Sequence, residues 1–282
     1  MKYYAVDFRL SPSNDNSRSL LASCAGDIGF EAFEDTANGV TGYIQQSYYD
    51  VGALREMVEN FPFPDIKVTY TTKEAEDKDW NEEWEREGFA PVMIDGVCCI
   101  HDGRHLPMAM PTMAIEIDAK MAFGTGTHET TRMMVKSILA LRPEGQRVLD
   151  CGCGTGILAI TALKAGACKA FGYDIDEWSV DNARHNAIIN QVGSRLTTVH
   201  GDATAISSME GAFNLVVANI NRNILLEDLQ TFRGAMAPGG HLLTSGFYTE
   251  DAALLTGKAA ALGLRHIGTL TDNGWACLHF SL

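Results

Sequence analysis

The chain has 282 residues, 46% of them hydrophobic, which suffices for one full-sized domain plus a small one. Its net charge of −14 argues against a nucleic-acid-binding protein, which usually presents a basic face, and suits a soluble protein or one that attracts a basic macromolecular partner. No apolar run approaches the ~18 residues of a membrane span, the N-terminal MKYYAVDFRL lacks the apolar core of a signal peptide, and seven cysteines show no paired spacing. We therefore expect a cytoplasmic protein with reduced thiols that binds no membrane.

Residues 1–72 alternate strand and helix patterns in the order βαββαβ. Strands are predicted at KYYAVDFR, GFEAFED, VTGYIQQ and IKVTY, and helices at NSRSLLASCA and residues 50–61. The Asn38-Gly39 pair between two alternating runs is a strong hairpin signal. This order predicts a small ferredoxin-like α+β domain. RNA-binding sheets share it, but their aromatic-basic pattern is missing here.

Residues 73–105 are predicted to be an acidic linker. Its first part, KEAEDKDWNEEWEREGF, is dominated by acidic residues, and a helix there would place Trp80 and Trp84 on one face. Two compatible interpretations are a solvated connector whose tryptophans dock on a neighbouring domain and a surface for a basic partner. Cys98 and Cys99 are expected to pack inside a strand.

Apolar strands and helices alternate from residue 106 to residue 282. The strand TMAIEIDA and the helix TTRMMVKSILAL come first, and strands and helices then follow in turn up to a closing strand pair, LRHIGTL and GWACLHF. In that first helix, Met134 and Ile138 share one apolar face. This pattern predicts an α/β, Rossmann-like domain with a doubly wound, mostly parallel sheet and an antiparallel closing strand.

The stretch VLDCGCGTGILAI predicts a strand, a glycine turn and a helix. Gly152 and Gly154 allow a tight turn and close approach to a ligand, beside the free N–H groups of a helix N-terminus. Asp174 ends the next strand, where an acid can accept both hydroxyls of a ribose. The order GxGxG, with Asp150 two positions earlier, differs from the GxGxxG of NAD-binding loops and favours S-adenosylmethionine. Asn219, at the end of VVANI, is expected to face the same crevice.

The polar stretch AFGTGTHETT precedes this region. It lacks the lysine of a phosphate-binding P-loop. His128 and Glu129 begin like an HExxH zinc helix, but the fifth residue is Arg132, so no metal site is predicted. Cys151 and Cys153 are more simply small residues in a tight turn than metal ligands.

These motifs together resemble the PrmA family, the bacterial ribosomal protein L11 methyltransferases. The similarity is carried by AFGTGTHETT, VLDCGCGTGILAI, GYDIDEWSVDNARHNAIIN, VVANI and DWNEEW, and it covers residues 76 to 282. The resemblance implies a class I methyltransferase domain that uses S-adenosylmethionine. It also implies an N-terminal substrate-recognition domain and, as substrate, ribosomal protein L11, methylated on its α-amine and lysines. We expect a monomer that recognises the free or ribosome-bound protein and makes no sequence-specific nucleic-acid contact.

The resemblance implies the following residue roles. Thr131, Gly152, Asp174 and Asn219 correspond to the cofactor contacts of the family, and the loop over the cofactor and its glycine turn add Phe123, Gly124, Thr130, Asp150 and Gly154. The Asn219 side chain and the Ile220 carbonyl are expected to accept hydrogen bonds from the N–H groups of the substrate amine, which must be neutral to attack. The sequence departs from common family residues at two places, Asp118-Ala119-Lys120 before the loop and Asn221-Arg222 after Ile220. These departures concern the binding of the substrate amine and not that of the cofactor.

Three other functions fit parts of the pattern. A methyltransferase for another protein or a small-molecule amine is compatible with the glycine turn, but the N-terminal domain and the specific loop weigh against a small molecule. An NAD-dependent dehydrogenase belongs to a different class and would be distinguished by titration with the two cofactors. An inactive cofactor-binding scaffold is disfavoured, because Thr131, Asp174 and Asn219 are all present.

Overall fold

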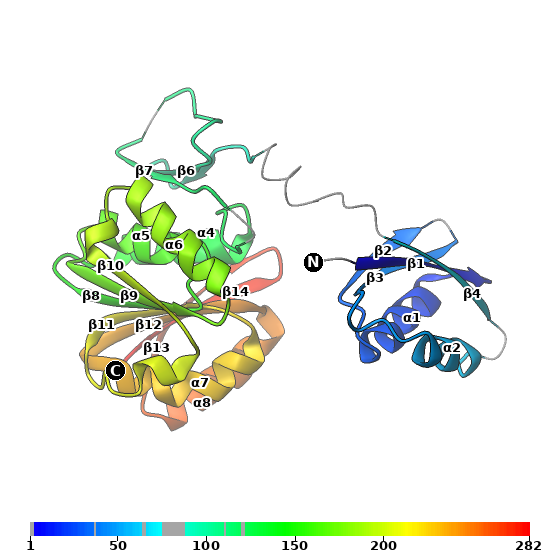
Figure 1. The fold of residues 1–282 in the computed structure, drawn as a ribbon. Coiled ribbons are helices and arrows are strands. Elements are labelled where there is room, and N and C mark those ends of the chain that lie inside the picture. The colour runs from blue at the N-terminus through cyan, green and yellow to red at the C-terminus, as the bar shows by residue number, and fades with distance from the viewer. Residues whose placement is uncertain (1–2, 37, 64–65, 75–87, 110, 120–121) are drawn as a thin grey trace. The chain divides into compact units, whose positions relative to one another are not determined.

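The computed structural model describes residues 3–36, 38–63, 66–74, 88–109, 111–119 and 122–282. It divides the chain into two compact units, Met1–Trp80 and Asn81–Leu282 (Figure 1). The connector helix predicted around Trp80 and Trp84 lies outside the described residues. Within the described part of the chain, no helix has the length and apolar character needed to cross a membrane.

The N-terminal unit is a four-stranded sheet with two helices. Its elements are β1 (Tyr3–Ser11), α1 (Asp15–Asp27), β2 (Ala32–Thr36), β3 (Gly39–Gln45), α2 (Val51–Glu59) and β4 (Lys67–Glu74). The strand order is β2-β3-β1-β4, and each neighbouring pair is antiparallel. Phe8, Leu21 and Leu54 are buried in its core. The elements follow the predicted order, whereas the ferredoxin-like classification stays a prediction.

A three-stranded sheet begins the C-terminal unit. It consists of β5 (Val92–Ile94), β6 (Cys98–His101) and β7 (Met113–Glu116), in the order β5-β6-β7. The first two strands fall inside the segment expected to be a linker, so residues 92–101 are part of a folded sheet. The acidic composition of residues 73–89 concealed two short apolar runs that pair across the turn at Asp95-Gly96. Cys98 and Cys99 are fully buried, as expected for strand packing.

The central sheet of this unit has seven strands in the order β10-β9-β8-β11-β12-β14-β13. Its strands are β8 (Arg147–Cys151), β9 (Lys169–Asp174), β10 (Leu196–His200), β11 (Phe213–Asn219), β12 (Met236–Tyr248), β13 (Arg265–Asp272) and β14 (Trp275–Ser281). Neighbours from β10 to β12 are parallel, and β14 is antiparallel to both of its neighbours. The predicted doubly wound sheet with an antiparallel closing strand is therefore confirmed.

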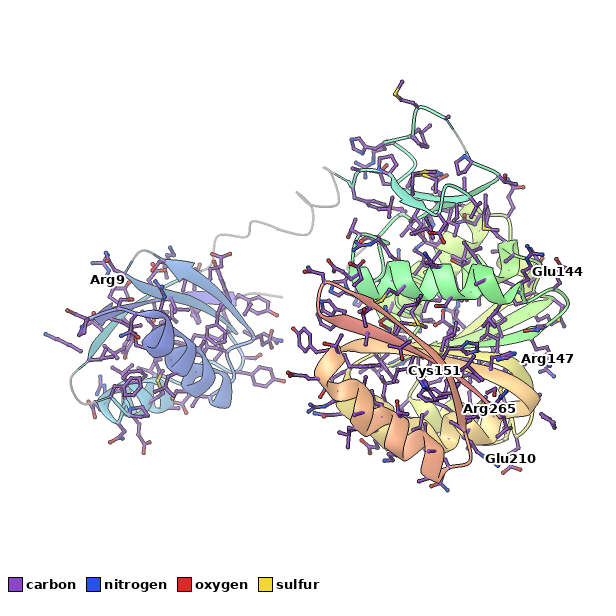
Figure 2. All side chains as sticks on the ribbon, turned by 180° about the vertical axis from the view of Figure 1, so that it is seen from behind. Arg9, Glu144, Arg147, Cys151, Glu210 and Arg265 are labelled. Carbon is purple, nitrogen blue, oxygen red and sulfur yellow. The ribbon has the colours of Figure 1, made fainter. Side chains whose placement is uncertain are left out.

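Helices cover both faces of the seven-stranded sheet (Figure 1). One face carries α4 (Glu129–Leu141), α5 (Ile157–Lys164) and α6 (Glu177–Ile189), and the other carries α7 (Arg222–Ala235) and α8 (Ala252–Ala261). The short helices η1 (Gly193–Arg195), η2 (Ala203–Ile206) and η3 (Thr249–Asp251) connect these elements. Met134 and Ile138 of α4 are fully buried, as their spacing predicted, and Cys151 lies in the interior of the unit (Figure 2).

Three asparagines at or just after α6 hold the backbone that leaves β7. Asn182, Asn186 and Asn190 recur every fourth residue and so share one side of the helix. Asn190 donates to the Glu116 carbonyl (2.6 Å) and accepts from the Glu116 N–H (3.0 Å). Asn186 accepts from the Asp118 N–H (2.9 Å), and Asn182 donates to the Asp118 carbonyl (2.8 Å). The side-chain amides thus bond this backbone as a neighbouring strand would.

Replacing Asn186 by leucine tests this arrangement. Asn186→Leu leaves the N–H of Asp118 and the carbonyl of Thr155, to which Asn186 donates, without their partner. Each buried polar group left unpaired costs about 1–3 kcal/mol, so the free energy of unfolding should fall by about 2–6 kcal/mol in urea titrations. Asn223→Leu, at an exposed position of α7, is the control and should change it by less than about 0.5 kcal/mol. Equal losses in the two variants would contradict this role.

Candidate functional site

The carboxyl ends of five parallel strands meet at one edge of the central sheet. The strand order runs outward from β8 to β10 on one side and from β11 to β12 on the other, so the connections reverse direction between β8 and β11. Open α/β sheets bind ligands in the crevice at such a point. The glycine turn of residues 152–156 follows β8, Asp174 ends β9 and Asn219 ends β11. The structure therefore brings these predicted residues to one place.

The glycine turn has no room for a side chain at Gly152 or Gly154. Gly152 and Gly154 have φ of +70° and +50°, in the left-handed region that favours glycine. A Cβ added to Gly152 would lie 2.4 Å from Cγ2 of Ile220, and one added to Gly154 would lie 2.3 Å from the carbonyl oxygen of Phe123. Both distances are well below van der Waals contact. Only glycine therefore fits at these two positions.

Asp174 forms a hydrogen bond with this turn and can still accept hydrogen bonds from a ligand. Its Oδ2 accepts from the N–H of Gly154 (2.9 Å), and its Oδ1 accepts from the N–H of Asp176 (3.1 Å). A carboxylate offers about four acceptor positions, so each oxygen of this half-buried group can take a further hydrogen bond. That arrangement suits the two hydroxyls of a ribose.

Two residues beside Asp174 were not assigned from the sequence. Ile175 follows it with 71% of its surface exposed, which offers an apolar face to a planar ring. Asp202 lies just beyond the end of β10, the strand paired with β9, and accepts from the N–H of Thr204 (2.9 Å). Asp202 follows the strand-like run LTTVH by two residues, so its strand-end position was the available signal.

The stretch AFGTGTHETT packs directly on the glycine turn. The Phe123 carbonyl accepts from the N–H of Thr155 (3.0 Å), and the Gly124 carbonyl accepts from the Thr155 hydroxyl (2.7 Å). Gly124 has a φ of +114°. The Phe123 side chain is 58% exposed, so it is available to a ligand above the turn. Residues 122–128 are called the glycine-turn loop below.

The first turn of α4 connects this loop to the end of β11. His128 is the N-cap residue, and its Nδ1 accepts from the N–H of Thr130 (3.2 Å). Thr130 and Thr131 are buried, at 1% and 0% exposure. The Thr131 hydroxyl accepts from Nδ2 of Asn219 (3.4 Å). His128 thus has a structural role as a helix cap, and Thr131 orients the Asn219 amide.

Asn219 presents an unpaired acceptor at the crevice. Its Oδ1 is buried and has no hydrogen-bond partner among the residues that the structure describes. Buried polar atoms are nearly always paired, so this oxygen indicates a place for a donor from a ligand. Ile220 follows, its N–H donates to the Ser245 carbonyl (3.2 Å), and a Cβ added to Gly246 would lie 2.3 Å from the Ile220 carbonyl oxygen. The backbone around Ile220 is therefore held in place.

Asp150 lies beneath the turn and not at its surface. It is fully buried, its Oδ2 accepts from the N–H of Ala159 (3.0 Å), and its Oδ1 has no partner among the described residues. Burial raises the pKa of this carboxyl well above its ordinary value, which favours the neutral acid. Its visible role is to fix the first turn of α5 against β8.

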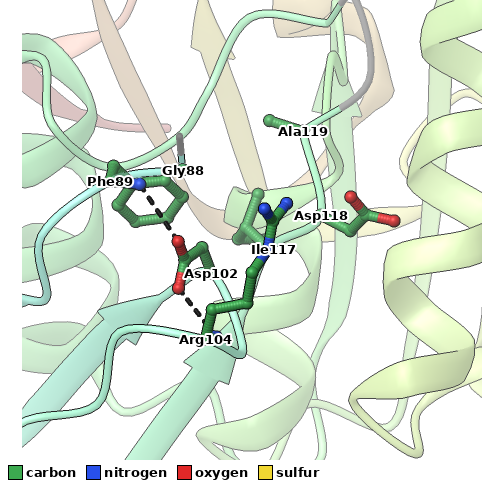
Figure 3. A pocket seen from close by; sticks show the side chains of 7 residues that line it. All are labelled: Gly88, Phe89, Asp102, Arg104, Ile117, Asp118 and Ala119. Atoms are coloured by element: carbon green, nitrogen blue, oxygen red, sulfur yellow. Dashed lines mark hydrogen bonds between the residues drawn. The ribbon is translucent and has the colours of Figure 1, made fainter. Parts of the chain in front are cut away.

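A separate small pocket lies among residues 88–119 (Figure 3). It is lined by Gly88, Phe89, Asp102, Arg104, Ile117, Asp118 and Ala119. Asp102 accepts from the N–H groups of Phe89 (3.1 Å) and Arg104 (2.9 Å), so it ties residue 89 to the end of β6. The lining includes neither the glycine turn nor Asn219. Within the described ranges no group of three or more His, Cys, Asp or Glu side chains could hold a metal ion.

Comparisons with known proteins agree with this geometry. Residues 27–282 match the family model described as ribosomal protein L11 methyltransferase (PrmA). A protein named ribosomal protein L11 methyltransferase from Phocaeicola vulgatus is 43% identical over 280 residues, covering 99% of each chain. The protein of the same name from Porphyromonas gingivalis is 39% identical over 286 residues, covering 100% of this chain and 98% of its own. A crystal structure of a ribosomal protein L11 methylase from Lactobacillus delbrueckii subsp. bulgaricus superposes with a TM-score of 0.62, at 25% identity over 68% of this chain and 98% of its own.

Replacing Asp174 tests the crevice as a nucleoside site. Asp174→Asn keeps the size of the side chain but removes its charge, and hydrogen bonds to charged groups contribute about 1.5–3 kcal/mol. S-adenosylmethionine affinity, measured by calorimetry, should fall at least about tenfold. Asp181→Asn, which removes an exposed charge from the neighbouring helix α6, is the control and should bind normally. Binding of NAD in place of S-adenosylmethionine would instead support the dehydrogenase alternative.

Proposed function

The chain belongs to the PrmA family of ribosomal protein L11 methyltransferases, and we propose that it methylates the lysine side chains and the α-amine of ribosomal protein L11. Its fold is that of the S-adenosylmethionine-dependent methyltransferases, and the crevice residues fit that cofactor. When bound, S-adenosylmethionine supplies a methyl group already activated on a sulfonium. The protein has mainly to align an amine with that group and to keep the amine neutral.

The observation that carries this proposal is the unpaired Oδ1 of Asn219. A lysine amine has a pKa of about 10.4, so only about one in two thousand is neutral at pH 7. An acceptor at the crevice binds an N–H of the amine and leaves its lone pair directed elsewhere. Asn219 and the carbonyl of Ile220 are the two acceptors proposed for this role. Because Thr131 accepts from Nδ2 of Asn219, the amide is held with its oxygen unpaired.

The other predicted residues are proposed to hold the cofactor. Asp174 accepts hydrogen bonds from the ribose hydroxyls. Gly152 and Gly154 keep the turn narrow enough for the cofactor to approach its backbone closely. The loop residues Phe123 and Gly124 cover the turn. Thr130, Thr131 and Asp150 are buried, so we assign them support of these groups.

The N-terminal unit is proposed to recognise the protein substrate. The described site residues lie in the C-terminal unit, and the βαββαβ unit carries no cofactor motif. The net charge of −14 is suited to a basic partner. We further propose that the protein acts as a monomer in the cytoplasm, on free or ribosome-bound ribosomal protein L11, without sequence-specific nucleic-acid contacts.

Asn219→Ala should reduce methyl transfer more than cofactor binding. We expect kcat to fall about 10- to 100-fold, because the contact with the amine tightens toward the transition state. The KM for S-adenosylmethionine should change less than about threefold, since Asp174 and the turn still hold the cofactor. Thr131→Val, which only frees the amide to rotate, should show the same trend more weakly. A near-normal kcat in Asn219→Ala at saturating cofactor would refute the acceptor role.

Removing the N-terminal unit tests its role in recognition. A chain that starts near residue 76 should bind S-adenosylmethionine with unchanged affinity, because the described crevice lies wholly in the C-terminal unit. Mass spectrometry of ribosomal protein L11 incubated with this shortened chain should detect no added methyl groups, whereas the full chain adds them. Normal methylation by the shortened chain would place substrate recognition elsewhere.

A further inference from the structure

Arg132 links three segments at the N-terminus of α4. Its Nη1 donates to the carbonyl of Thr127, at the end of the glycine-turn loop. Its Nη2 lies 2.9 Å from Oδ2 of Asp272, the last residue of β13, and 3.5 Å from Oε1 of Glu129. One guanidinium therefore joins the loop, the helix and the β13–β14 hairpin. Arg132 is also the residue that stands where an HExxH zinc helix would have its second histidine.

The hairpin turn is held against α4 by further contacts. Asn273 and Gly274 have φ of +48° and +82°, as in a two-residue turn of type I′. Nδ2 of Asn273 donates to Oε1 of Glu129 (3.3 Å). Trp275, the first residue of β14, packs edge-on against His128, with ring centroids 4.9 Å apart. In Figure 1 the hairpin, in red, passes beside α4.

The loop that Arg132 holds is the one that covers the glycine turn. Thr127 belongs to the same seven residues in which the carbonyls of Phe123 and Gly124 accept from Thr155. We propose that Arg132 is a positioning residue that holds the glycine-turn loop over the cofactor crevice by tying Thr127 to Asp272. This inference rests on the proposed function, because it assumes that S-adenosylmethionine occupies the crevice.

The chemistry of the guanidinium suits this task. Its donors are fixed in one plane, so it can bond a carbonyl and a carboxylate at the same time, whereas a lysine ammonium is a point charge on a flexible stem. Arg132 and Asp272 have side chains 30% and 43% exposed, and ion pairs this exposed contribute little to stability. The main effect of Arg132 is therefore to position the glycine-turn loop and not to stabilise the folded protein.

Arg132→Met and Arg132→Lys test the proposal in the full chain. The dissociation constant for S-adenosylmethionine should rise about tenfold in Arg132→Met and less in Arg132→Lys, which keeps one of the two bonds. The melting temperature should shift by less than about 2 °C. Lys136→Met is the matched control: it removes the same charge one turn further along α4, where Lys136 bonds only Asp95 among the described residues (3.0 Å), and its affinity should equal that of the unaltered chain.

Asp272→Asn tests whether the link to the hairpin matters. It should raise the dissociation constant as well, and Arg132→Met combined with Asp272→Asn should be no weaker than Arg132→Met alone, because both changes break one link. Additive losses, or unaltered affinity in Arg132→Met, would overturn the proposal. Should Arg132→Met fail to fold, Asp272→Asn decides by the same measurement. An unaltered chain that binds no S-adenosylmethionine would instead contradict the proposed function.

Discussion

The turn between β8 and α5 has no room for a side chain at Gly152 or Gly154, and the candidate site is built around that crowding. Ile220 closes it from the end of β11, and Phe123 closes it from the glycine-turn loop. Its backbone N–H groups donate to Asp174, to the carbonyl of Phe123 in the loop, and to the carbonyls of Tyr173 and Cys153. Three separate segments of the chain are thereby brought within contact of one turn. A ligand at this edge meets surfaces whose positions are set by packing before it arrives, which lowers the entropic cost of binding.

The first turn of α4 is the second point on which the site depends. His128 caps the helix, Thr131 orients Asn219, and Arg132 reaches both the loop and the β13–β14 hairpin. None of these side chains needs to touch a ligand to matter. Their contacts connect the glycine-turn loop, the end of β11 and the β13–β14 hairpin. The acceptor oxygen of Asn219 and the glycine turn are thereby kept at a fixed separation.

Much of this arrangement could be predicted from local sequence. Alternation of strands and helices predicted the central sheet, because each pattern depends only on neighbouring residues. Strand-end positions predicted that Asp174 and Asn219 would meet, because parallel strands present their carboxyl ends at one edge. The contacts of Arg132 with Asp272 and of Thr131 with Asn219 join residues far apart in the chain, and no local pattern reveals them. The strands β5 and β6 were missed because the acidic composition before them dominated the segment.

The amides of α6 also have a consequence for the behaviour of the protein in a crowded cell. β7 is an edge strand of its sheet, and an open edge offers N–H and C=O groups to the strands of other chains. Asn190 occupies both groups of Glu116, and Asn182 and Asn186 occupy those of Asp118. Side chains of α6 and of Asn190 just after it therefore occupy the end of this edge in place of a further strand. The backbone that leads to the glycine-turn loop is protected from intermolecular β-pairing and the aggregation that follows from it.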